Sequence, residues 1–101
     1  MTPRFVEMPA VEALELGDVL QALGDPVRLE IVRRLAADGE SACGAFPLPV
    51  GPATRSHHLK VLREAGVTAT RAVGTQRFVS LRRDDLAARF PGLLDSVLAA
   101  T

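Results

Sequence analysis

The sequence predicts a small, mainly α-helical domain that carries one two-stranded β-hairpin. Apolar side chains recur at helical spacing along most of the chain, whereas β-branched residues cluster around the dipeptide Gly74-Thr75. Aromatic residues are limited to four phenylalanines, and the remaining apolar residues, rich in leucine, valine and alanine, suit helix-on-helix packing. A chain of 101 residues supports one modest core, so residues 1–101 are expected to form a single domain.

The N-terminal part is expected to form a loose arm followed by two helices. Two prolines within residues 1–9 favour an irregular arm. Residues 11–23 then carry apolar side chains at helical spacing. A second helix is expected over residues 26–39, and the side chain of Asp25 can cap its first turn. The proline that starts this helix is tolerated, because its position needs no amide donor.

The central part is expected to contain a third helix. Residues 40–51 hold two prolines and a final glycine, which allow one short helical turn followed by a loop. The segment PATRSHHLKVLREA, residues 52–65, begins with a proline that suits a first turn. Gly66 then ends this helix.

The C-terminal part is expected to start with the hairpin and to end with helical segments. A glycine in the first position of a two-residue turn, as in Gly74-Thr75, is typical of a type II′ hairpin. A helical stretch then starts at Asp84 or Asp85, and Pro91-Gly92 interrupts it. A closing apolar stripe follows this interruption.

Positive charge is concentrated in one third of a neutral chain. The formal net charge is zero, yet residues 52–83 hold seven lysines and arginines and a single glutamate. Such a basic segment is typical of a protein that binds a polyanion, although it is also compatible with an ordinary solvated face.

The third helix is expected to turn a small, polar and cationic face outward. At 100° per residue, Leu59 lies on the core side, whereas Ser56, His57 and Lys60 lie on the opposite side. His58 is expected to pack beside the core, so the two adjacent histidines point in different directions and do not readily share a metal ion. A helix with such a face fits the major groove of DNA.

The neighbouring segments complete a DNA-binding pattern. The short element before the third helix would supply the first half of a helix-turn-helix. Arg71 and Arg77 flank the hairpin turn, where a basic β-wing can lie along the DNA backbone or in the minor groove. The residue pattern therefore favours double-stranded DNA as the partner.

Three segments carry a further signal, namely ALGDPVRLEIVRRLA, TRSHHLKVLREAGV and GTQRFVSL. Together they resemble the ArsR/SmtB (arsenic-repressor) family of bacterial regulators, and the resemblance covers about residues 16–86. It implies a dimeric winged helix-turn-helix fold, with the first and last helices at the dimer interface. It also implies a repressor that a ligand, often a metal ion or an oxidant, releases from its operator.

The expected contact residues follow from the helical wheel and from this resemblance. The expected DNA-binding residues are Thr54, Arg55, Ser56, His57, Lys60, Arg63, Arg71, Gly74, Thr75, Gln76 and Arg77. The expected dimer interface is an apolar surface that so short a chain does not readily hide alone, namely Val11, Leu14, Leu93, Leu94, Val97 and Leu98. The alternative is that these apolar residues complete the core of a monomer.

The chain departs from the family pattern at three places. Arg55 stands on the core side of its helix where the family usually has an apolar residue, and it is expected to reach a phosphate or an acidic group. Cys43 is the only cysteine, and one thiolate makes no closed metal site. The last helix lacks histidines and offers only carboxylates. No cofactor is therefore predicted. Cys43 is expected to be an inert, buried apolar residue, with an intersubunit cysteine pair as the alternative.

Several functional alternatives remain open at the level of sequence. One is a regulator that responds to a nickel-like ion through oxygen and nitrogen ligands. Another is a DNA-binding or partner-binding module without an inducer. An enzyme is not expected, because no nucleophile with its base and no glycine-rich phosphate loop is recognisable. A single cysteine and no long apolar stretch favour a cytoplasmic protein without a membrane segment.

Overall fold

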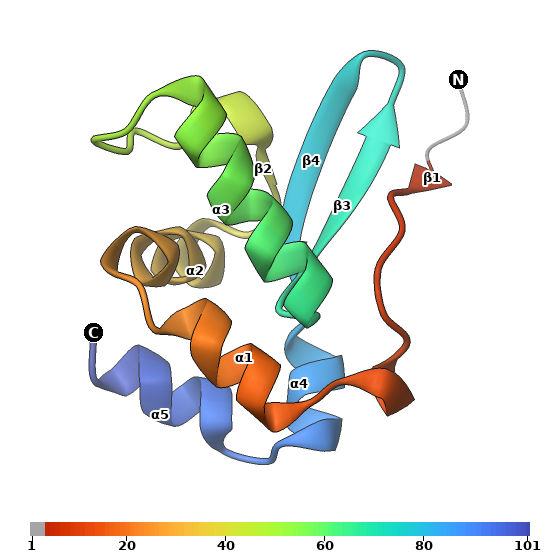
Figure 1. Ribbon diagram of the computed structural model, residues 1–101, viewed down its shortest axis with the longest axis vertical. Helices are drawn as coiled ribbons and strands as arrows, with labels where there is room; N and C mark the ends of the chain where they lie inside the picture. Colours follow the sequence, from red (N-terminus) through yellow and green to blue (C-terminus); the bar gives the residue numbers. More distant parts are fainter. Residues whose placement is uncertain (1–3) are drawn as a thin grey trace.

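The structure, a computed structural model, describes residues 4–101 and contains the predicted helices and hairpin (Figure 1). The helices are α1 (Leu16–Leu23), α2 (Pro26–Asp38), α3 (Pro52–Ala65), α4 (Arg83–Arg89) and α5 (Leu93–Ala99). The strands are β1 (Arg4–Phe5), β2 (Ser41–Ala42), β3 (Thr68–Val73) and β4 (Gln76–Leu81). Two 3-10 turns, η1 (Val11–Ala13) and η2 (Cys43–Ala45), complete the order. The prediction of a mainly helical domain with one hairpin is confirmed.

The hairpin of β3 and β4 forms the centre of a four-stranded antiparallel sheet. Its order is β1-β3-β4-β2, and Val73 faces Gln76 across the turn. Gly74 has a φ of 60°, and no non-glycine residue in the described chain has a positive φ. A positive φ at the first turn residue alone is the pattern of the predicted type II′ turn.

The expectation of a loose arm over residues 1–9 is wrong for the part that the structure describes. β1 pairs with β3, and the amide of Val6 donates to the carbonyl of Thr70 at 2.8 Å. The buried Arg82 donates from Nη1 to the carbonyl of Pro9 at 2.7 Å. Without this arm, the outer edge of β3 would leave backbone groups unpaired, which explains why the arm joins the sheet. Residues 1–3 of the expected arm lie outside the described residues.

Two further segments differ from the predicted elements. The helical spacing expected over residues 11–23 divides into η1 and α1, because the extended backbone of Leu14 and Glu15 separates them. Leu14 thereby turns into the core, where it is 1% exposed. The expected short turn after residue 40 is present as η2, but the strand β2 precedes it and extends the sheet beside β4.

Two side chains hold α1 and α2 together by binding free backbone groups at the ends of these helices. Oδ1 of Asp25 accepts hydrogen bonds from the amides of Val27 and Arg28, at 2.8 and 3.1 Å, and so caps α2 as predicted. The guanidinium of Arg28 donates to the carbonyl groups of Ala22 (2.6 Å) and Gln21 (3.3 Å), which belong to the last turn of α1. The tight connection between α1 and α2 is therefore held from both sides.

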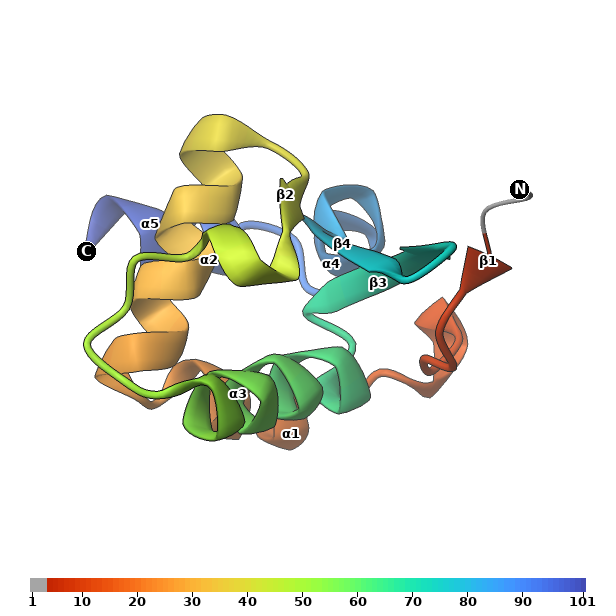
Figure 2. The ribbon, with the colours of Figure 1, turned by 90° about the horizontal axis from the view of Figure 1, so that it is seen from above.

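A single apolar core joins the helices to the hairpin. Its most deeply buried members come from α1, α2, α3, α4 and β4 and from the loops beside them: Leu14, Val19, Ile31, Val32, Leu62, Val67, Val79 and Leu86. Seen from above, α3 lies on one side of the molecule and the hairpin extends away beside it (Figure 2). The core thus supports α3 and the hairpin on the same scaffold.

Gly66 ends α3 in a left-handed conformation at a crowded position. Its φ is 88°, and a Cβ atom added there would lie 2.0 Å from Cδ2 of Leu14. Gly92, before α5, has a similar conformation with a φ of 82°, but a Cβ atom there would meet nothing within 4 Å. The two glycines therefore separate the effect of backbone conformation from the effect of crowding.

We expect Gly66→Ala to destabilise the protein more than Gly92→Ala does. The left-handed conformation alone costs an alanine about 1–2 kcal/mol, and only at Gly66 does the overlap with Leu14 add to this cost. Urea unfolding of both variants at one protein concentration measures the difference. Equal losses in the free energy of unfolding would contradict the packing of Leu14 against the end of α3.

Asp25 is expected to make folding stability depend on pH. Partial burial opposes its ionisation, but the amide hydrogen bonds and the charge of Arg28 outweigh this and lower its pKa. A lowered folded-state pKa means that the stabilisation is complete above the ordinary carboxyl range and is lost as the pH falls through the folded-state pKa.

The matching variants are Asp25→Ala and Asp25→Asn. Asp25→Ala should lower the free energy of unfolding at neutral pH by about 1 kcal/mol, because the cap is lost. Asp25→Asn keeps an oxygen acceptor, so it should retain most of the stability while the acid-dependent loss becomes smaller. Urea unfolding across the acidic range tests this, and an unchanged pH dependence in Asp25→Asn would show that another group is responsible.

Candidate nucleic-acid interface

The outward face of α3, formed by Ser56, His57 and Lys60, is exposed. Thr54, one turn before His58, is exposed as well. On the opposite side of the helix, Leu59 is 7% exposed and belongs to the core. The orientation predicted from the helical wheel is therefore confirmed.

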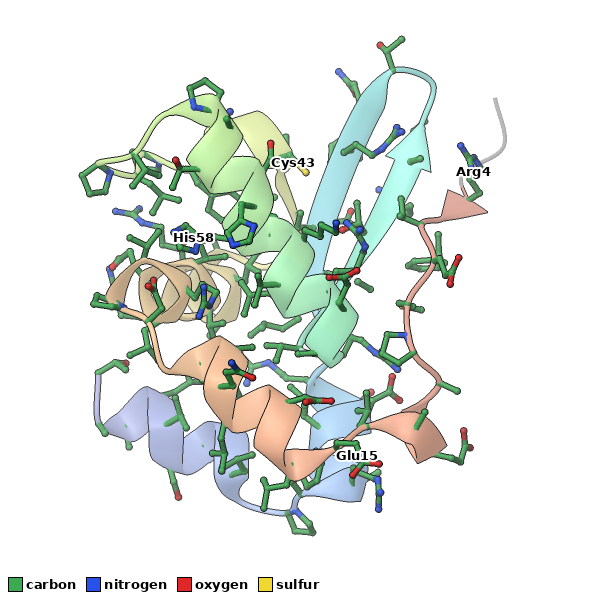
Figure 3. All side chains as sticks on the ribbon, viewed as in Figure 1. Arg4, Glu15, Cys43 and His58 are labelled. Atoms are coloured by element: carbon green, nitrogen blue, oxygen red, sulfur yellow. The ribbon has the colours of Figure 1, made fainter. Side chains whose placement is uncertain are left out.

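His58 is a packed histidine, as the sequence indicates. Its Nδ1 atom lies 3.1 Å from Nη1 of Arg28. A guanidinium has no acceptor, so Nδ1 of His58 accepts this hydrogen bond. Figure 3 shows His58 on the side of α3 that faces α2. Among residues 4–101, no group of three or more histidine, cysteine or acidic side chains is placed to hold a metal ion.

The turn of the hairpin presents polar groups to solvent. Gly74, Thr75, Gln76 and Arg77 are all exposed. The hairpin is the part of the sheet that projects beyond the helices (Figure 1). With an arginine beside the tip, it has the form of the expected β-wing.

Arg71 does not extend freely from the wing as the sequence suggests. Its Nη2 atom lies 2.7 Å from Oε1 of Glu40, its Nε atom lies 3.2 Å from Oε2, and its guanidinium stands 5.0 Å from the ring centre of Phe78. The hydrogen bonds from Arg71 lower the pKa of Glu40, although partial burial opposes this. Because β2 carries Glu40 to the hairpin, this contact was invisible to local sequence patterns.

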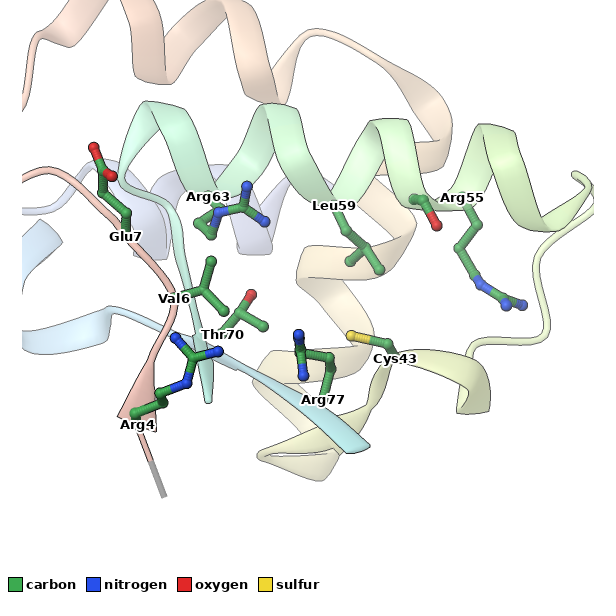
Figure 4. A pocket seen from close by; sticks show the side chains of 10 residues that line it. Arg4, Val6, Glu7, Cys43, Arg55, Leu59, Arg63, Thr70 and Arg77 are labelled. Carbon is green, nitrogen blue, oxygen red and sulfur yellow. The ribbon is translucent and has the colours of Figure 1, made fainter. Parts of the chain in front are cut away.

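Arg55 and Arg63 of α3 lie at the edge of a cavity that Arg77 and Cys43 line from its other side (Figure 4). The two α3 arginines are half-buried, and with Arg4 of β1 and Arg77 of β4 they line this cavity of about 360 Å³. We call this space the arginine cavity. No ion pair joins Arg55 to an acidic group within the described chain, contrary to one of the two expectations for this residue.

Cys43, in η2, also lines the arginine cavity. Burial raises the pKa of its thiol, and the positive charges of Arg77, Arg55 and Arg63 oppose the rise without cancelling it. The thiol is therefore mainly protonated at neutral pH. The side chain is half-buried, not fully buried as expected.

The expected dimer interface is only partly available on the surface of a subunit. Leu14 and Leu94 are buried in the core of the subunit itself, at 1% and 7% exposure, so they are not free to meet a partner. The remaining members are half-buried against the core: Val11, Leu93, Val97 and Leu98. The large apolar side chains that are exposed on a helix are instead Leu16 (46%) and Leu20 (48%) of α1.

Comparison with known proteins agrees with this arrangement. Residues 23–71, from the end of α1 to β3, match the family described as a helix-turn-helix domain. The HTH-type transcriptional regulator YceK of Bacillus subtilis is 40% identical over 96 residues, which cover 92% of this chain and 96% of that protein. A crystal structure of an ArsR family regulator shares the fold, with a TM-score of 0.66, 24% identity, and coverage of 84% of this chain and 89% of the other.

The chain belongs to the ArsR family of helix-turn-helix transcriptional regulators. Other similar proteins of this kind include the biofilm growth-associated repressor of Agrobacterium fabrum, which is 36% identical over 99 residues covering 94% of this chain and 83% of that protein. The crystal structure of the transcriptional repressor BigR from Xylella fastidiosa matches with a TM-score of 0.66 and 31% identity, covering 84% of each chain.

Three residues near the interface of this ArsR-family chain were not predicted from the sequence, namely Arg28, Arg4 and Glu40. Each acts across the fold, since Arg28 meets α1 and α3, Arg4 reaches the wing through β1, and Glu40 reaches Arg71. No local spacing signals such contacts.

None of the described helices is long and apolar enough to cross a membrane.

Proposed function

We propose that this protein is a transcriptional repressor that binds a palindromic operator as a homodimer. The observation that carries the proposal is the exposed polar face of α3 beside the basic wing. Ser56 of α3 and Arg77 of the wing line the same cavity, so the two DNA-binding elements meet on one side of the molecule. Repression, as opposed to activation, is supported by two similar proteins that are named repressors, the biofilm growth-associated repressor of Agrobacterium fabrum and BigR.

In this proposal, α3 enters the major groove with its exposed face toward the bases. Ser56 and His57 are placed to contact base edges, while Lys60 and Thr54 are placed to contact edges or phosphates. The residues proposed for the adjoining backbone are Arg55, Arg63, Gly74, Thr75, Gln76 and Arg77. Arg71 joins them only when it leaves Glu40, since its guanidinium is otherwise occupied.

The homodimer follows from unpartnered apolar side chains at the helical end of the subunit. Leu16 and Leu20 stand one turn apart on α1, and both are nearly half exposed. The half-buried Leu93, Val97 and Leu98 on α5 extend the apolar surface available to a partner. A two-fold dimer places two recognition helices about one DNA turn apart, roughly 34 Å, and so requires an operator with two half-sites.

The proposal assigns no inducer. The alternative of a nickel-like ion needs several nitrogen or oxygen ligands, and residues 4–101 bring no three candidate ligands together. The alternative of an inducer-independent module is tested by measuring operator affinity with and without added ligands.

Lys60→Ala should weaken binding to every duplex sequence and reduce its salt dependence. One lost phosphate contact lowers the slope of log affinity against log salt by about 0.9. Fluorescence anisotropy with the protein's own upstream DNA and with an unrelated duplex, at several salt concentrations, measures both effects. The matched control is Arg33→Ala, which removes one positive charge from the exposed surface of α2.

Replacement of Ser56 by alanine should instead change which sequence is preferred, because a base-edge contact carries sequence information. If Lys60→Ala behaves like Arg33→Ala in affinity and salt slope, the orientation proposed for α3 on DNA is wrong.

Leu20→Lys should weaken the dimer, because a charged side chain cannot be buried in an apolar interface. Loss of one buried leucine costs about 1.5–3 kcal/mol, so the dissociation constant should rise by at least about tenfold. Sedimentation velocity over a dilution series measures this. Gln21→Lys introduces the same charge at the neighbouring exposed position of α1 and should leave the dimer intact. Equal behaviour of the two variants would place the interface elsewhere.

A further inference from the structure

The arginine cavity is built from segments that are far apart in the sequence. Arg55 and Arg63 enter it from α3, Arg77 from β4, and Arg4 from the N-terminal strand β1 (Figure 4). Thr70 of β3, only 5% exposed, also lines it. The pairing of β1 with β3 brings Arg4, Val6 and Glu7 to the cavity.

The charge in this cavity is unbalanced. Four arginines and one glutamate, Glu7, give its lining a formal charge of +3. Within residues 4–101, the ion pairs involve other arginines, and none joins a carboxylate to the four that line the cavity. Cationic groups that converge without counter-charges raise the local potential and attract an anion.

Arg63 supplies an independent indication of a ligand. Its Nε atom is buried and has no hydrogen-bond partner within the described chain. Buried polar groups are nearly always hydrogen-bonded, so this donor in a cationic cavity is available to an acceptor from outside the chain, such as an oxyanion or water. A planar guanidinium is also well suited to donate to two oxygens of one oxyanion.

We propose that the arginine cavity binds a small molecule bearing a phosphate-type oxyanion. Its volume of about 360 Å³ lies within the range of small-ligand pockets, and its lining combines cations with the hydroxyl of Thr70 and the apolar side chain of Leu59. The same chemistry is offered by a phosphate of the DNA backbone, so the test below separates the two sources.

Binding here is coupled to DNA binding if the proposed function is correct. Arg55, Ser56 and Arg77 line the cavity and also belong to the proposed DNA-contacting surface. An oxyanion in the cavity neutralises positive charge beside the duplex, so it lowers operator affinity. By linkage, DNA lowers the affinity for the oxyanion by the same factor. The binding itself does not rest on the proposed function, because free phosphate is tested without DNA.

Cys43 makes the occupancy of the cavity measurable. It is the only cysteine in the chain and it lines the arginine cavity, so its rate of reaction with a neutral aromatic disulfide reports on this place alone. Inorganic phosphate is titrated at constant ionic strength with chloride as the balancing anion. A bound oxyanion that covers the thiol should slow labelling about tenfold once phosphate reaches about ten times its dissociation constant.

Two variants separate specific binding from general screening. Arg63→Gln removes the guanidinium with the unpartnered donor and should abolish protection, whereas Arg33→Gln removes the same charge outside the cavity and should retain it. If Arg63→Gln fails to fold, as judged by thermal unfolding, the exposed Arg77→Gln takes its place. A parallel series uses duplex DNA at concentrations that saturate every variant.

Protection by free phosphate that is lost in Arg63→Gln supports the small-molecule site. Protection by DNA alone, with none by free phosphate, overturns the small-molecule site and assigns these arginines to contact with the DNA backbone. Absence of protection by both, or equal protection in Arg63→Gln, overturns the proposal. DNA affinity measured separately reports on the proposed function, so the two can fail independently.

Discussion

The guanidinium of Arg28 links three helices, and the position of the recognition helix depends on this link. It donates to two carbonyl groups at the end of α1 and to His58 of α3, while its own backbone amide is held by the cap of α2. Arginine is suited to this role because its five donors lie in one rigid plane. The apolar side chains of Leu59 and Leu62 then seat α3 on the core. The polar face of α3 is thereby presented outward.

The elements that could be predicted from sequence are those with local causes. The bounds of α3 follow from Pro52 and Gly66, and the turn of the wing follows from Gly74, because proline and glycine act on the backbone at their own positions. The outward face of α3 was predictable for the same reason, since a helix fixes the angle between neighbouring side chains. The strands β1 and β2 were not predictable, because two residues carry no periodicity and pair only with a hairpin that is already formed.

The differences at the candidate interface have the same origin. Arg71 was expected to contact DNA, and no local pattern indicated that Glu40, which comes directly before β2, pairs with it. Leu14 and Leu94 were counted as surface because a one-dimensional pattern shows only that they are apolar. The sharp break before α1 turns Leu14 inward, against the glycine that ends α3. Whether a particular leucine is buried depends on the path of the backbone in three dimensions, and the sequence pattern alone does not reveal that path.

The short strands at both edges of the sheet also bear on how the protein behaves at high concentration. A bare two-stranded ribbon exposes backbone donors and acceptors on each side, which invites edge-to-edge aggregation with other chains. In this protein β1 occupies part of one margin and β2 part of the other, and each is only two residues long. β1 pairs with Arg71 and Ala72 close to the turn, and β2 pairs with Phe78 and Val79 in the middle of β4, so the projecting part of the ribbon is shielded from intermolecular strand addition on both sides.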